Sequence, residues 1–88
     1  MESENIKAVL SILGGEKATR LMQEQNKISF IVSAKSNKIT IKNEIEKQFD
    51  VKVQSVNIIN KMEGSKVAIV KLAPEYLAMD LATKLGLI

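Results

Sequence analysis

The spacing of apolar side chains predicts short helices and strands in alternation. Between residues 16 and 25, apolar positions recur every three to four residues, which predicts a short amphipathic helix. The Gly14-Gly15 pair in front of it supplies a flexible turn. Ile28, Phe30 and Val32 then alternate with the residues between them, which is the period of a strand.

A helix over residues 38–49 is the most strongly marked element. Its apolar side chains follow helical spacing, and Ser36 or Asn37 stands where a capping residue is needed. The apolar stripe consists of Ile41, Ile45 and Phe49. The side chains expected to face away from the core are Lys42, Glu46 and Lys47.

Two β-rich runs follow this helix. Residues 51–59 are dense in β-branched side chains, residues 66–73 form a second such run, and Glu63-Gly64-Ser65 marks a tight turn between them. The two runs are therefore predicted to form an antiparallel hairpin. Val53 and Val56 lie on opposite phases of a two-residue repeat, which indicates a bulge or burial on both faces.

The two ends of the chain complete the set of elements. A C-terminal helix is predicted to start at Pro74 and to end before Gly86. Its apolar stripe is formed by Leu77, Leu81 and Leu85. Residues 5–13 fit the period of a strand or of a helix, and we interpret them as a strand. The alternating residues are Ile6, Ala8, Leu10 and Ile12.

The resulting order, β-α-β-α-β-β-α, is that of an α+β fold in which helices cover a small, mainly antiparallel, four-stranded sheet. A length of 88 residues predicts a single domain over residues 1–88. The chain has no Cys and no His, which excludes thiol catalysis, imidazole acid–base chemistry and the usual zinc sites. The uncharged apolar stretch at residues 8–15 is far below the roughly 20 residues of a membrane span, so we expect an intracellular, soluble chain.

The net charge of +3 is concentrated in the middle of the chain. Residues 26–61 hold seven Lys against three acidic residues, whereas the segments before and after them carry net charges of −1 and 0. No acidic residue lies between Gln25 and Asn43. The lysines inside that window are Lys27, Lys35, Lys38 and Lys42. The pattern fits an anionic partner, but a solvated lysine-rich face is the commoner origin of such a patch in a small domain.

No motif indicates an enzyme. Gly14-Gly15 lacks the context of a phosphate-binding loop. Glu44 and Glu46 are two residues apart on the predicted helix, so they point to different faces and are interpreted as solvated surface. An RNA-recognition fold would need several aromatic residues on its sheet, and Phe30 is interpreted as core. Lysines around a helix start at residues 35–42 suit a phosphate that is held by position and not by base identity.

A series of short motifs runs through the chain. They are Asn26-Lys27-Ile28-Ser29-Phe30-Ile31-Val32, Ser36-Asn37-Lys38, Ile41-Lys42, Ile45-Glu46-Lys47, Phe49, Val51-Lys52-Val53, Ser55-Val56-Asn57 and Val70-Lys71-Leu72. In order and spacing, the chain over residues 16–88 resembles large-subunit ribosomal protein twenty-three. It is similar to the archaeal branch in its short hairpin loop at residues 61–66. Its closing motifs are similar too, and they are Pro74-Glu75-Tyr76 and Ala82-Thr83-Lys84-Leu85-Gly86.

The resemblance implies a structural protein of the large ribosomal subunit, with no catalytic role, no cofactor and no metal. It implies binding to large-subunit ribosomal RNA near the exit of the nascent-chain tunnel, in a cytoplasmic ribosome. Neighbouring ribosomal proteins are implied partners, as is the signal recognition particle or another nascent-chain factor. Matched motif by motif, the residues expected to bind RNA are Lys17, Lys35, Asn37, Lys38, Lys42, Asn57 and Lys66. The residue expected to dock the factor is Glu16.

An alternative function belongs to a different class. The chain would be a small α+β protein-interaction or ligand-sensing module, with its lysines facing solvent and its sheet or a helix groove binding a partner. Co-sedimentation with large ribosomal subunits through a moderate salt wash separates the two, because only the first requires it.

Overall fold

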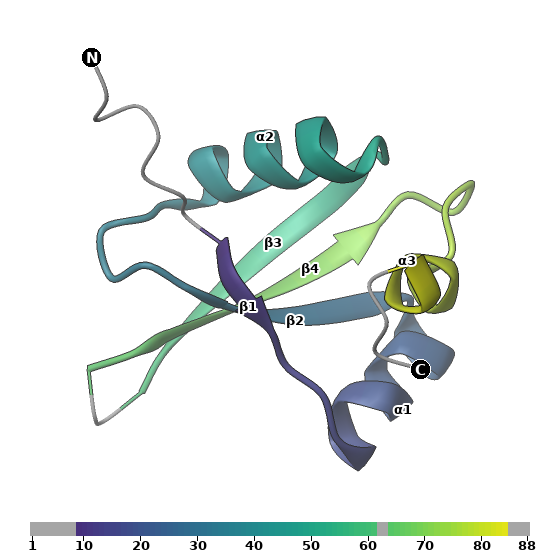
Figure 1. The fold of residues 1–88 in the computed structure, drawn as a ribbon, viewed down its shortest axis with the longest axis horizontal. Helices are drawn as coiled ribbons and strands as arrows, with labels where there is room; N and C mark the ends of the chain where they lie inside the picture. The colour runs from purple at the N-terminus through teal and green to yellow at the C-terminus, as the bar shows by residue number, and fades with distance from the viewer. Residues whose placement is uncertain (1–8, 62–63, 85–88) are drawn as a thin grey trace.

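The fold is α+β, with three helices and a four-stranded antiparallel sheet in the predicted order (Figure 1). The computed structural model describes residues 9–61 and 64–84. The elements are β1 (Val9–Ile12), α1 (Glu16–Gln25), β2 (Lys27–Val32), α2 (Lys38–Phe49), β3 (Val53–Asn60), β4 (Lys66–Leu72) and α3 (Ala78–Lys84).

The strands lie in the order β1-β2-β4-β3, so β2 and β4 form the centre of the sheet. β3 and β4 are the predicted hairpin, and β4 also pairs with β2 along its whole length. In the hairpin loop, the Lys61 amide donates to the Ser65 carbonyl at 2.8 Å, and Gly64 has a φ of 93°. A side chain at that backbone angle is strained, so a glycine suits this turn.

A register shift falls in each edge strand. The shift between Val53 and Ser55 confirms the predicted bulge, and it allows Val53 and Val56 both to be buried. A second shift lies in β1, between Val9 and Ser11. It turns Leu10 outward at 62% exposure, so the predicted alternation that put Leu10 on one face with Ile12 is wrong there. The predicted strand residues before Val9 lie outside the described part.

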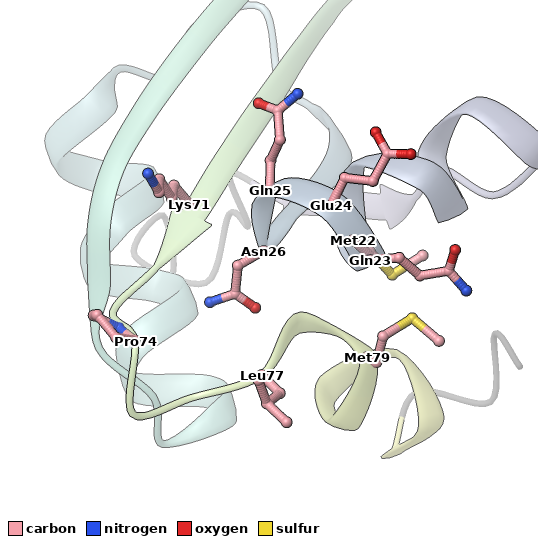
Figure 2. Close-up of a pocket in the computed structure, with 9 residues that line it drawn as sticks. All are labelled: Met22, Gln23, Glu24, Gln25, Asn26, Lys71, Pro74, Leu77 and Met79. Atoms are coloured by element: carbon pink, nitrogen blue, oxygen red, sulfur yellow. The ribbon is translucent and has the colours of Figure 1, made fainter.

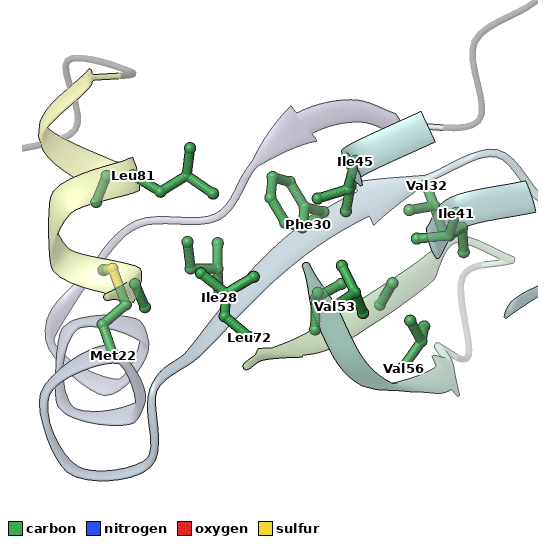
Figure 3. Packing of buried hydrophobic residues seen from close by; sticks show 14 residues of the cluster. Met22, Ile28, Phe30, Val32, Ile41, Ile45, Val53, Val56, Leu72 and Leu81 are labelled. Atoms are coloured by element: carbon green, nitrogen blue, oxygen red, sulfur yellow. The ribbon is translucent and has the colours of Figure 1, made fainter. Parts of the chain in front are cut away.

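The core lies between one face of the sheet and the three helices, to which α2 contributes most centrally and α1 and α3 add Met22 and Leu81 (Figure 3). Ile41 and Ile45 of α2 are fully buried, as the sequence pattern predicts. The ring of Phe49 stacks on that of Phe30, with centroids 6.3 Å apart. The sheet contributes alternate residues of its two central strands, namely Ile28, Phe30 and Val32 from β2 and Ala68, Val70 and Leu72 from β4.

The helices α1 and α3 lie together at the end of the sheet where β2 begins (Figure 1). α3 starts later than predicted, at Ala78, because Pro74 lies in a turn that precedes the helix. Leu77 is 57% exposed and does not join the core, so the predicted stripe is wrong at this residue. The residues that α3 buries are Ala78, Leu81 and Ala82. Leu85 and Gly86 lie outside the described residues.

Asn26 connects these helices to the sheet. It ends α1 with a left-handed φ of 57°, and its side-chain amide donates to the carbonyls of Tyr76 (2.8 Å) and Leu72 (3.3 Å). Its carbonyl oxygen Oδ1 accepts the Ala78 amide at 2.7 Å, at the start of α3. One side chain therefore links the end of α1 to the end of β4 and to α3.

The burial of α2 yields a prediction with a matched control. Ile45→Ala should lower the free energy of unfolding by about 2 to 5 kcal/mol, because the deleted atoms leave a cavity in the core. Ile39→Ala removes the same atoms from a side chain of α2 that is 72% exposed, so its cost should stay near 0.5 kcal/mol or below, which is roughly the range for surface sites. Urea unfolding followed by circular dichroism measures both variants. Equal losses would contradict the packing described here.

Candidate nucleic-acid interface

The segment between β2 and α2 presents three of the predicted site residues to solvent. Lys35, Asn37 and Lys38 are all exposed. The Asn37 Oδ1 accepts the Thr40 amide at 2.8 Å, so this residue is the N-terminal cap of α2. Ser33 secures the turn, because its hydroxyl accepts the Lys35 amide at 3.3 Å. The lysines therefore project from a hydrogen-bonded turn.

Lys66, which is distant in the sequence, lies beside the same turn between β2 and α2. It begins β4 and lies opposite Val32, at the end of β2 that leads into the turn. Its half-buried side chain donates from Nζ to the Ser36 carbonyl at 3.4 Å. The sheet thus adds a fourth residue to the cluster at the start of α2.

Lys42 extends this cluster along α2. It follows Lys38 by four residues and is also exposed, so both side chains lie on one side of the helix. We call Lys35, Lys38, Lys42 and Lys66, together with Asn37, the helix-start cluster.

The two carboxylates of α2 face the sheet, not the solvent. Glu44 accepts the Val9 amide of β1 at 3.1 Å, and Glu46 accepts the Val53 amide of β3 at 2.8 Å. Both side chains are half-buried. The interpretation of the pair as solvated surface is therefore wrong, and so is the expectation that Glu46 faces away from the core. Each acid satisfies a backbone amide at the start of a strand, where the sheet supplies no partner.

The hydrogen bonds of Glu44 and Glu46 also affect the charge around the lysines of the helix-start cluster. Glu44 and Glu46 are the only acidic residues of α2, and both are occupied at the sheet. Within residues 9–61 and 64–84, the ion pair formed is between Arg20 and Glu24, at 3.7 Å on α1. Among those residues, no carboxylate pairs with the lysines of the helix-start cluster. A positive surface that lacks internal neutralisation favours an anionic partner.

The remaining predicted site residues lie elsewhere. Glu16 and Lys17 are exposed in the first turn of α1, at the other end of β2 from the helix-start cluster (Figure 1). Asn57 is exposed in β3 and pairs with Ile69. Because the neighbours of Ile69 in β4 point into the core, Asn57 lies on the sheet face opposite α2. The structure therefore assembles five of the eight residues and separates the other three.

A hollow of about 440 Å³ lies between α1 and the segment that leads into α3 (Figure 2). Asn26 lies at its centre, and the amide of this residue is already engaged with Leu72, Tyr76 and Ala78. The other lining residues include Met22, Pro74, Leu77 and Met79. Among residues 9–61 and 64–84, no group of three His, Cys, Asp or Glu side chains could hold a metal ion. None of the helices in these ranges has the length and apolar character of a membrane span. Apart from Glu24 and Lys71, the residues that line the hollow are apolar or carry side-chain amides.

Among the residues that the structure describes, the helix-start cluster therefore gathers five of the eight predicted site residues on one charged surface. Its lysines come from a turn, a helix and a strand, and they surround the N-terminus of α2, which itself favours negative charge. Such an arrangement can hold several phosphates of a nucleic-acid backbone without reading base identity.

The chain matches a known protein family. The model of the family described as ribosomal protein L23 matches residues 7–77. The matched range extends from before β1 to the residue that precedes α3. It contains all eight predicted site residues.

The capping role of Asn37 can be separated from any binding role. Asn37→Ala should lower the free energy of unfolding by about 1 kcal/mol, because the Thr40 amide loses its acceptor. Asn37→Asp keeps an acceptor and adds a negative charge at the helix start, so its stability should match that of the parent. Thermal unfolding compares the three proteins. A loss in Asn37→Asp as large as that in Asn37→Ala would contradict the cap.

Proposed function

This chain belongs to the ribosomal protein L23 family, and from that premise we propose that it binds large-subunit ribosomal RNA near the nascent-chain tunnel exit and helps to dock nascent-chain factors there. The family makes it a structural, non-catalytic protein of the large ribosomal subunit. Its partners accordingly include ribosomal RNA and neighbouring ribosomal proteins in the cytoplasm.

The observation that carries the proposed RNA binding is the helix-start cluster. Four lysines converge there, and the acids that could have neutralised them are hydrogen-bonded to strand amides instead. Lysine neutralises RNA phosphates and releases counterions, which is the main source of affinity for a folded RNA backbone. The proposed contacts are with phosphate and sugar, because the exposed side chains around the cluster provide no aromatic platform for bases.

Factor docking is proposed for the opposite end of the molecule. Glu16 is exposed in the first turn of α1, remote from the helix-start cluster along the sheet. The two functions therefore need not compete for one surface. The side chains of Glu16 and Lys17 project about 100° apart around the helix axis. Lys17 can therefore contact RNA while Glu16 contacts an incoming factor.

We also propose that the chain is of the archaeal-like branch. The connection between β3 and β4 covers only residues 61–65, which leaves no room for a long RNA-penetrating loop. RNA affinity would then depend on the helix-start cluster more than on the hairpin.

Co-sedimentation tests the proposed function against the alternative of a protein-interaction or ligand-sensing module. Tagged protein expressed in cells should sediment with large ribosomal subunits and remain bound through a moderate salt wash. Release into the soluble fraction under those conditions would favour the alternative module.

The proposed RNA contacts of α2 can be tested by charge reversal. Lys38→Glu combined with Lys42→Glu should weaken binding to large-subunit ribosomal RNA, and should flatten the slope of log affinity against log salt by roughly 0.7 to 0.9 per lost contact. Filter binding over a salt series measures the slope. Both side chains are exposed, so circular dichroism should show an intact fold.

A double variant of equal charge change provides the control. Lys47→Glu with Lys84→Glu alters two exposed lysines outside the helix-start cluster. This double variant should change the slope of log affinity against log salt much less than the Lys38→Glu, Lys42→Glu variant does. If the two double variants lost the same affinity, net charge alone would explain the effect and the assignment of the cluster would fail.

The proposed docking role of Glu16 has its own test. Glu16→Ala should leave incorporation into large subunits intact and should reduce binding of signal recognition particle to those subunits. Glu24→Ala, which changes an exposed acid on the last turn of the same helix, is the matched control. Titration of purified subunits with the particle measures both. If parent and Glu16→Ala subunits bound the particle with equal affinity, the docking role would fail. Glu16 would then act only at the helix start, where the helix dipole stabilises a carboxylate.

A further inference from the structure

Two lysines face each other across the central strands of the sheet. Lys27 of β2 and Lys71 of β4 are direct partners in the antiparallel register. Direct partners in such a pair have Cα atoms about 4.5 to 5.5 Å apart and project from the same face of the sheet. Both side chains are half-buried, so solvent screens their charges less than it screens those of exposed lysines.

This pair lies on the sheet face opposite α2. The next residues along each strand, Ile28 and Val70, point into the core, so Lys27 and Lys71 point the other way. Ser55 of β3 is the register partner of Lys71 on its other side. Asn57 follows two residues later on the same face, at a diagonal position about 7 to 8 Å from Lys71, which a long side chain can span.

Like charges in direct opposition destabilise a sheet. No carboxylate of residues 9–61 and 64–84 forms an ion pair with either lysine. The acid on the neighbouring part of α1, Glu24, already pairs with Arg20 at 3.7 Å. Lys71 lines the hollow together with Gln25, a neutral residue (Figure 2). Within the described part of the chain, the sheet therefore carries a repulsion that no ion pair relieves.

We infer that Lys27, Lys71 and Asn57 form a second RNA contact, in which the two ammonium groups share one phosphate and the Asn57 amide bonds to an adjoining backbone oxygen. An anion between the two lysines converts their repulsion into two attractions. Lys27 and Lys71 are assigned no role by the family resemblance, and the inference rests on the proposed RNA-binding function.

The second contact accounts for the position of Asn57, which the fold separates from the helix-start cluster. The two surfaces occupy opposite faces of the sheet, and Lys71 and Lys66 stand at opposite ends of β4. The five residue steps of strand from Lys66 to Lys71 span about 17 Å. RNA that reaches both surfaces has to pass around the protein on two sides.

The repulsion makes the test specific, because stability and binding should change in opposite directions. Lys27→Gln and Lys71→Gln should each raise Tm at low salt by about 1 to 4 °C, since either one removes the repulsion. The double variant should gain little more than either single variant. In the same proteins, the salt slope for large-subunit ribosomal RNA should flatten by roughly 0.7 to 0.9 per lysine removed.

Lys84→Gln is the control, because it removes one exposed lysine from α3 and should change neither quantity beyond error. An unchanged salt slope in the Lys27 and Lys71 variants overturns the inference, whatever happens to Tm. The Lys38→Glu, Lys42→Glu double variant, measured alongside, keeps the two proposals distinct. If it loses affinity while the Lys27 and Lys71 variants do not, only the second contact fails. If neither set loses affinity, RNA binding by this protein fails.

Discussion

The docking of α2 on the sheet is the constraint on which the rest of the structure depends. Ile41 and Ile45 hold the helix by complete burial, and the carboxylates of Glu44 and Glu46 hold it by hydrogen bonds to the starts of β1 and β3. Apolar burial alone would allow the helix to rotate or slide by small amounts. The two carboxylates limit that freedom, because each must meet a single backbone amide.

This docking also sets the electrostatic character of the surface. With its acids hydrogen-bonded to strand amides, α2 presents lysines that form no ion pair with a carboxylate of residues 9–61 and 64–84. The same two side chains thus stabilise the fold and leave the helix-start cluster positive. A protein that had only to fold would gain from a nearby acid at these lysines. The lack of such an acid fits the proposed RNA binding, in which phosphates would supply the negative charge.

A second set of contacts, made by Asn26, holds α1 and α3 at the other end of the sheet. Asn26 satisfies backbone groups of Leu72, Tyr76 and Ala78 and so attaches α1 and α3 to the end of the sheet. Its left-handed backbone, favoured by asparagine among the residues with a side chain, turns the chain sharply from α1 into β2. These hydrogen bonds involve no residue of α2, so the segment that carries the proposed factor-docking turn has its own attachment to the sheet.

The sequence by itself determined the order of the elements, the bounds of α1 and α2 and the hairpin, because periodicity and capping are local properties. In β3 it indicated a bulge or burial on both faces, and the structure has the bulge. Tertiary structure decided the rest. Leu10 and Leu77 fit apolar repeats but are exposed, because a register shift and a late helix start reoriented them. Glu44 and Glu46 looked like surface residues, since nothing local reveals that strand amides lie beside them. The approach of Lys66 to Ser36 and the opposition of Lys27 and Lys71 depend on strand pairing between distant segments, which local patterns do not encode.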